Sequence, residues 1–87
     1  MIRYRRVQYA PILSGGPAPI HVRAVTYQDC LPVAHGPVGL HAASPGALTT
    51  LLRDIARQCE EEPVLDAAWL DAQCQENADG VDRRAGR

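Results

Sequence analysis

The clearest hydrophobic pattern in the chain predicts a long amphipathic helix from Ser44 to Glu61. Its apolar residues recur at the three- and four-residue spacing that places side chains on one face of a helix. This apolar stripe consists of Leu48, Leu51, Leu52, Ile55 and Cys59. Ser44 is suited to the N-cap and Pro45 to the first helical position, and Pro63 ends the helix because the residue before a proline disfavours helical geometry.

Alternating apolar and polar positions predict three strands before this helix. They are expected at Arg3–Tyr9, Ile20–Tyr27 and Pro32–His35, and the prolines and glycines of residues 10–19 predict a loop between the first two. An amphipathic helix needs a cover for its apolar stripe. We therefore expect the sheet to provide it, with Leu52 and Ile55 packed against Val22, Val25 or their strand neighbours.

A second, shorter helix is predicted from an N-cap at Asp66 through Gln75, with Leu65, Ala68, Trp69 and Ala72 on its buried side. No periodicity continues from Glu76 onward. The chain is thus predicted to be a single β-β-β-α-α domain over residues 1–75 and a flexible C-terminal tail over residues 76–87. The fold class is α+β, a small three-stranded antiparallel sheet packed on one face against the long helix and the short one.

The composition indicates a small core. The 87 residues include no Phe, one Trp and one Met, so partners or self-association are plausible sources of stability for so small a domain. No apolar run suits a signal peptide or a membrane span, which predicts a cytoplasmic protein without a membrane partner. Three cysteines, an odd number, are expected to be reduced thiols there.

Charge is segregated along the chain although the net charge is only −1. Six arginines and two acids precede Cys59, whereas residues 59–82 contain eight acids and no base. Segregation of this kind can steer a partner or hold a tail against its own domain. An acidic C-terminal segment that only keeps the protein soluble is the alternative. Glu60, Glu61 and Glu62 stand at a helix C-terminus, where the helix dipole disfavours negative charge. We therefore expect an external basic contact, since no base follows before Arg83.

Candidate catalytic and metal-binding residues do not form a recognised motif. The spacing of Cys30, His35, His41, Cys59 and Cys74 matches no zinc finger or ribbon, and a Cys30–His35 or Cys30–His41 nucleophile pair lacks a third orienting group. Ser14-Gly15-Gly16-Pro17 lacks the helix and Lys-Ser/Thr pair of a phosphate-binding loop. The sequence therefore predicts no metal, no cofactor and no enzymatic activity.

The residues of the predicted strands resemble those of a family of small uncharacterised bacterial proteins. The resemblance is carried by Tyr4-Arg5-Arg6-Val7, by Ile20-His21-Val22-Arg23-Ala24-Val25-Thr26-Tyr27 and by Pro63-Val64-Leu65-Asp66. These match a "YRV" strand, an "IHEVYYD"-like strand and a closing "PVLD" motif beyond an amphipathic helix, over roughly residues 2–66. The chain departs from the family at Gln28-Asp29-Cys30-Leu31, where an acidic glycine turn is usual. The family implies the fold and no activity; a looser similarity to HicB-type antitoxins rests on topology alone.

Two functions remain open from the sequence. The first is a non-catalytic accessory or regulatory protein that binds another protein, such as a larger complex with a basic surface. Its expected partner-binding residues are Glu60, Glu61, Glu62, Asp66, Trp69 and Asp71. The alternative is an antitoxin-like or nucleic-acid-associated regulator that uses the arginine-rich first strand. Alternation places Arg3 and Arg5 on one strand face and Arg6 on the other, which makes nucleic acid the less favoured partner.

Overall fold

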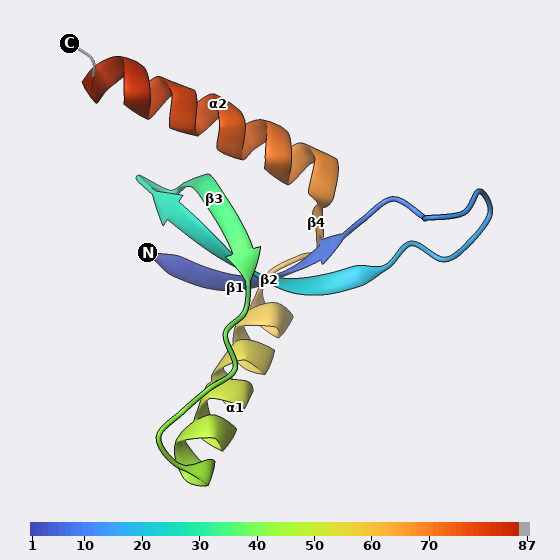
Figure 1. The fold of residues 1–87 in the computed structure, drawn as a ribbon, viewed down its shortest axis with the longest axis vertical. Helices are drawn as coiled ribbons and strands as arrows, with labels where there is room; N and C mark the ends of the chain where they lie inside the picture. Colours follow the sequence, from blue (N-terminus) through green and yellow to red (C-terminus); the bar gives the residue numbers. More distant parts are fainter. Residues whose placement is uncertain (86–87) are drawn as a thin grey trace.

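The computed structural model describes residues 1–85 and has an α+β architecture, as the sequence predicts. The elements are β1 (Ile2–Gln8), β2 (Ile20–Gln28), β3 (Leu31–Pro37), α1 (Pro45–Glu61), β4 (Leu65–Asp66) and α2 (Ala67–Ala85). Figure 1 shows α2 on one side of the sheet and α1 on the other. The expectation that both helices pack on one face is therefore wrong.

The sheet has four strands in the order β3-β2-β1-β4, one more than predicted. The first three strands are antiparallel as expected, whereas β4 runs parallel to β1 and pairs Val7 with Leu65 and Gln8 with Asp66. α1 makes this parallel pairing feasible, because a parallel neighbour requires a crossover connection. The predicted purely antiparallel sheet is corrected to a mixed one.

The hydrophobic core lies between the sheet and α2. Val7 and Val25 are fully buried, and they meet Ala67, Leu70 and Cys74 of α2. The buried side of α2 is therefore not the one predicted, since Ala68, Trp69 and Ala72 are exposed and Leu65 is only partly buried. Val25 packs under α2, so the expected packing of α1 on Val25 is also wrong.

α2 continues ten residues beyond the predicted end at Gln75. Residues 76–85 are helical, and residues 86–87 lie outside the described part of the chain. The division into a domain over residues 1–75 and a flexible tail remains a prediction. Within residues 1–85, no helix combines the length and the apolarity that a membrane crossing requires.

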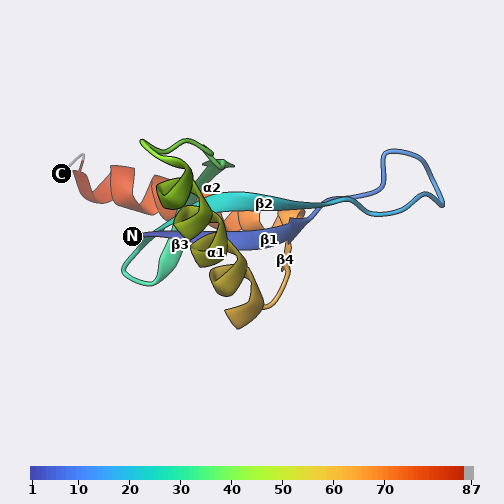
Figure 2. The same ribbon diagram turned by 90° about the horizontal axis from the view of Figure 1, so that it is seen from below.

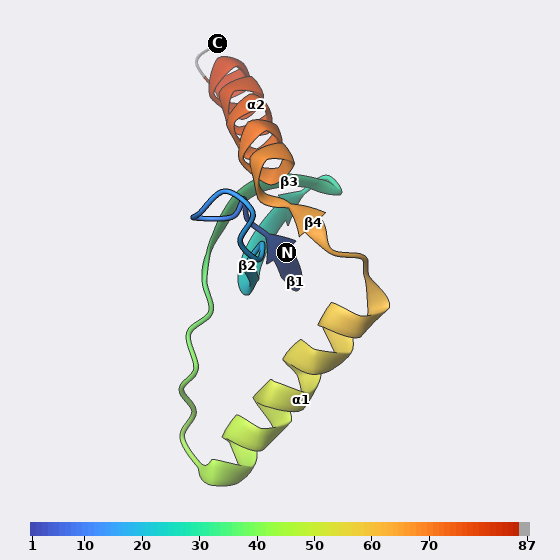
Figure 3. The same ribbon diagram turned by 90° about the vertical axis from the view of Figure 1, so that its right-hand side faces the viewer.

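α1 begins and ends where the sequence predicts, but it does not lie on the sheet. The Ser44 hydroxyl accepts a hydrogen bond from the Ala47 amide at 3.1 Å, and Pro45 occupies the first turn. Only the C-terminal part is buried, at Ile55, Gln58 and Cys59. Figure 3 shows the N-terminal half leading away from the strands. Leu52 is 46% exposed, so the predicted burial of Leu52 is wrong and that of Ile55 is confirmed.

The two hairpins differ in length. The loop after β1 extends well beyond the sheet (Figure 2), and its Ile12 and Leu13 are exposed. The β2–β3 connection is a two-residue turn in which Asp29 and Cys30 both have positive φ, at 53° and 66°. Positive φ at both central residues matches the twist of a tight antiparallel hairpin.

Candidate functional site

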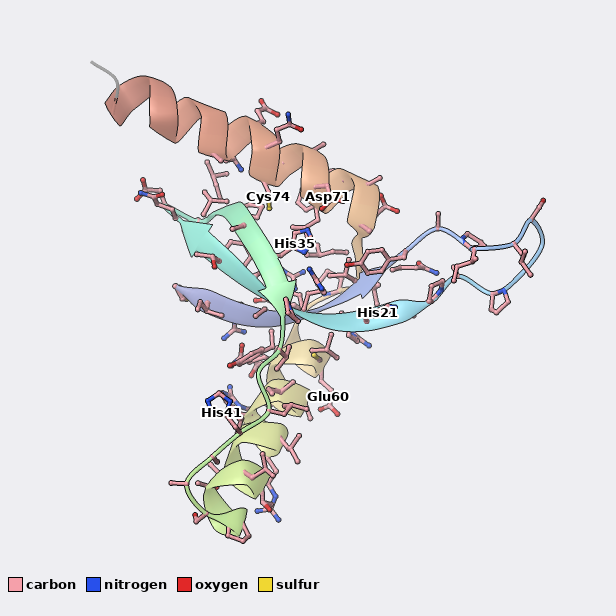
Figure 4. All side chains as sticks on the ribbon, in the orientation of Figure 1. His21, His35, His41, Glu60, Asp71 and Cys74 are labelled. Atoms are coloured by element: carbon pink, nitrogen blue, oxygen red, sulfur yellow. The ribbon has the colours of Figure 1, made fainter. Side chains whose placement is uncertain are left out.

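The structure distributes the six predicted partner-binding residues over two places. Glu60, Glu61 and Glu62 lie at the end of α1, whereas Asp66, Trp69 and Asp71 lie at the start of α2. Figure 4 shows Glu60 and Asp71 on opposite sides of the sheet. The two groups are therefore separate surfaces, and each has its own contacts.

The acidic end of α1 is held by arginines of β1. Arg3 forms ion pairs with Glu61 at 3.2 Å and with Glu62 at 3.3 Å, and Arg5 pairs with Glu62 at 2.7 Å. Arg57 adds a pair with Glu61 one helical turn away, at 3.0 Å. These glutamates are therefore balanced within the chain by Arg3, Arg5 and Arg57, which all precede them in the sequence. The expected contact with an external basic surface stays a prediction.

Arginines from both faces of β1 donate hydrogen bonds to the backbone that follows α1. Arg6 donates to the Glu62 carbonyl and Arg5 to the Pro63 carbonyl, both at 3.1 Å. Adjacent residues of a strand point to opposite faces, so Arg5 and Arg6 reach the segment from either side. We call Arg3, Arg5 and Arg6, together with the segment Glu61–Pro63, the arginine clamp.

Gln58 and Cys59 seal the edge of β1 next to the clamp. The Gln58 side-chain oxygen accepts a hydrogen bond from the Tyr4 amide at 3.0 Å, and the Cys59 thiol donates to the Tyr4 carbonyl at 3.9 Å. β4 pairs with β1 only at Val7 and Gln8, so these side chains satisfy backbone groups that the sheet leaves open. The C-terminal end of α1 thus replaces part of a strand at this edge.

The clamp changes the interpretation of the N-terminal arginines. Arg5 is buried, and Arg3 and Arg6 are only partly exposed. Their charges meet carboxylates and carbonyls of the same chain, whereas a nucleic-acid surface presents arginines to solvent as one basic patch. In the sequence, the only indication of this contact between β1 and the end of α1 is that arginines precede Cys59 and acidic residues follow it.

The first turn of α2 holds Trp69 outward. Asp66 caps the helix, because its carboxylate accepts a hydrogen bond from the Trp69 amide at 3.0 Å. Ala67 and Leu70 pack inward on the sheet, which leaves Trp69 on the outer side with 47% of its surface exposed. Trp69 is therefore not enclosed by the core, and the exposed Ala68 and Ala72 leave space around its ring.

A polar chain ties α2 to β2 and β3 beside this face. Arg23 donates from Nε to His35 Nδ1 at 3.2 Å, and His35 Nε2 lies 2.5 Å from the Asp71 carboxylate. Because Nδ1 accepts, the proton of a neutral ring sits on Nε2 and is donated to Asp71. His35 thus contacts β2 through Nδ1 and α2 through Nε2. Figure 4 shows His35 of β3 and Asp71 of α2 beside each other on this side of the sheet.

The three thiols have different environments. Burial raises the pKa of the Cys59 thiol, against the lowering effect of Arg6 and Arg5. Burial, together with the negative charge of Asp71, raises the pKa of the Cys74 thiol. Both act as small apolar residues rather than as thiolate nucleophiles, whereas Cys30 is exposed on the β2–β3 turn.

No metal cluster is formed within the described residues, since no three His, Cys, Asp or Glu side chains come close enough to hold an ion. A pocket of about 390 Å³ lies beside the clamp, lined by Arg3, Arg5, Tyr27, Cys30 and Glu62 among others. Its arginines already pair with Glu62. The pocket therefore offers little net charge to an anionic ligand.

Comparisons of the chain with protein-family models, with curated proteins and with solved structures found no match.

Proposed function

We propose that the protein is a small non-catalytic accessory or regulatory protein that binds another protein through the outer face of α2. The observation that carries the proposal is Trp69, a large aromatic side chain held half-exposed on a capped helix. Tryptophan is enriched among the residues that dominate binding energy at protein interfaces. Because the Asp66 cap fixes the first turn of α2, the backbone at Trp69 also loses little conformational freedom when a partner binds.

The surroundings of Trp69 suit an interface anchor. Asp66, which ends β4 and caps α2, and Asp71 in α2 are both exposed near Trp69 in the sequence, and they supply a polar, negatively charged rim beside an apolar centre. A partner surface of matching chemistry has an apolar pocket bordered by basic residues. Glu61 and Glu62 are not part of this proposed interface, because their carboxylates pair with arginines in the arginine clamp.

Other features of the site support a binding role rather than a catalytic one. His35 has both ring nitrogens engaged by Arg23 and Asp71, and Cys59 and Cys74 are buried. The arginine clamp weighs against the nucleic-acid alternative, because Arg3, Arg5 and Arg6 contact their own chain. Binding through α2 uses only side chains that the fold leaves accessible.

The test compares Trp69→Ala with Leu13→Ala, a matched truncation of another exposed apolar residue. A protein captured from the native host by the immobilised wild-type chain is purified, and its affinity for each variant is measured by calorimetry. The proposal predicts a loss on the order of 30-fold for Trp69→Ala and an unchanged affinity for Leu13→Ala. Equal binding by both variants, or no captured protein, would contradict it.

A further inference from the structure

We propose that a second copy of this chain covers the exposed half of α1 together with the sheet face turned away from α2, so that the protein is a homodimer. This surface is distinct from the outer face of α2. On α1 it comprises the partly exposed Leu48 and Leu51 and the 46% exposed Leu52. On the sheet it comprises Ile2, Ile20 and Val22, which are 57%, 55% and 42% exposed.

The two apolar surfaces lie on the same side of the molecule. Val7 and Val25 point toward α2, so the alternate positions of β1 and β2, Val22 among them, point away from it. Figures 1 and 3 both show α1 on that side, at an angle to the strands. In many domains an amphipathic helix packs against an apolar sheet face and buries both. In this chain the exposed half of α1 and this sheet face do not pack against each other.

The arginine clamp opposes closure of α1 onto its own sheet. The end of α1 is fixed to the edge of β1 by the Arg5–Glu62 ion pair, by two arginine–carbonyl hydrogen bonds and by the Gln58–Tyr4 hydrogen bond. Laying the helix flat on the sheet would turn it about this end and break these contacts. A copy of the chain can cover both surfaces without breaking them.

The charge pattern favours an identical partner. Residues 38–52, which form the linker after β3 and the exposed half of α1, contain no Asp, Glu, Lys or Arg, although 22% of the chain is charged. Around a two-fold axis each residue near the axis meets its own copy, so a charged surface would repel itself. On the sheet face Arg6 lies opposite Val22, but its guanidinium donates to the Glu62 carbonyl of its own chain. A surface that is otherwise apolar has little of this penalty, and interfaces of obligate homodimers are the more hydrophobic class.

The chain exposes more surface than a compact monomer of its size. The chain exposes 6240 Å², whereas a compact monomer of its mass is expected to expose about 5,000 Å². Its radius of gyration is 15.2 Å, against about 12 Å for a compact chain of this length. The excess is larger than the roughly 800 Å² that each partner contributes to a standard interface, and the uncovered half of α1 contributes to it together with the extended β1–β2 loop.

The test is the mass of the full chain in solution by sedimentation equilibrium at micromolar concentrations. The wild type is expected to have twice the 9.4 kDa of one chain. Leu52→Asp should weaken the dimer at least about 100-fold, because a carboxylate would be buried without a partner. The matched control Leu13→Asp, in the β1–β2 loop, should remain a dimer. A monomeric wild type, or equal effects of the two variants, would overturn the proposal.

A crosslinking experiment keeps the proposal testable if Leu52→Asp fails to fold. In a Cys30→Ser background, Thr50→Cys places a thiol on the exposed half of α1 and Ser14→Cys places one in the β1–β2 loop. A short bifunctional maleimide is expected to join two Thr50→Cys chains and to leave Ser14→Cys chains separate. Crosslinking of neither variant, or of both to the same extent, would contradict this interface whatever Leu52→Asp does.

Discussion

Single residues decide which side of the sheet and of each helix is buried and which side is exposed to solvent. Val7, Val25 and Leu70 have no exposed surface. In the sequence, the alternation of apolar and polar residues in the strands is the only indication that the two valines are buried. Leu70 was missed because Leu65, Ala68, Trp69 and Ala72 also recur at helical spacing, so the wrong side of the helix was expected to be buried. Ser44 and Pro45 were found because capping depends on neighbouring residues alone.

Cys30 occupies a backbone conformation that suits glycine. Its φ of 66° lies in the left-handed region, which costs a residue with a Cβ roughly 1–2 kcal/mol. Replacing Cys30 by Gly removes that strain and loosens the unfolded chain slightly. We therefore expect a net stabilisation of about 0.5–1 kcal/mol, measured as the free energy of unfolding in urea. Cys30→Ala keeps the Cβ and should gain nothing; if it gains as much as Cys30→Gly, backbone strain at this turn is not the cause.

Helices and strands could be predicted where the residues that define them are close together in the sequence. The bounds of α1 follow from Ser44, Pro45 and Pro63, and β1 and β2 follow from alternation. β4 has two residues and no period of its own, and its pairing with β1 joins Val7 to Leu65 across most of the chain. The clamp is equally non-local, since Arg3 and Glu61 are 58 positions apart. Contacts of this kind cannot be assigned from one sequence.

Replacement of Glu62 tests whether the arginine clamp holds α1 in place. Its carboxylate pairs with Arg3 and with Arg5, whose side chain is only 10% exposed. Glu62→Gln removes the charge from these contacts and is expected to lower the free energy of unfolding by about 1–3 kcal/mol. The neighbouring exposed Glu60 provides the control, and Glu60→Gln should change stability by less than about 0.5 kcal/mol. Similar effects for both variants would mean that the clamp does not hold α1 in place.

In the whole molecule, the fold covers only the C-terminal part of α1 and leaves the N-terminal half of this amphipathic helix exposed. The sequence indicates a stripe that needs burial, and we expected the sheet of the same chain to bury it. The structure instead covers one sheet face with α2 and uses the end of α1 to seal the edge of β1. The uncovered part of the stripe and the sheet face are the basis for the proposed dimer, and the exposed Trp69 is the basis for the proposed binding of a different protein.

The arrangement of α1 can be tested by isotope-filtered nuclear Overhauser spectroscopy on a mixture of labelled and unlabelled chains. Leu52 is the reporter because it lies on the exposed part of the stripe. The account predicts contacts between the Leu52 methyl groups and protons of the other chain, together with contacts of Leu70 to Val7 and Val25 within one chain. Contacts between Leu52 and Val22 found only within one chain would show that α1 closes onto its own sheet and would contradict the account.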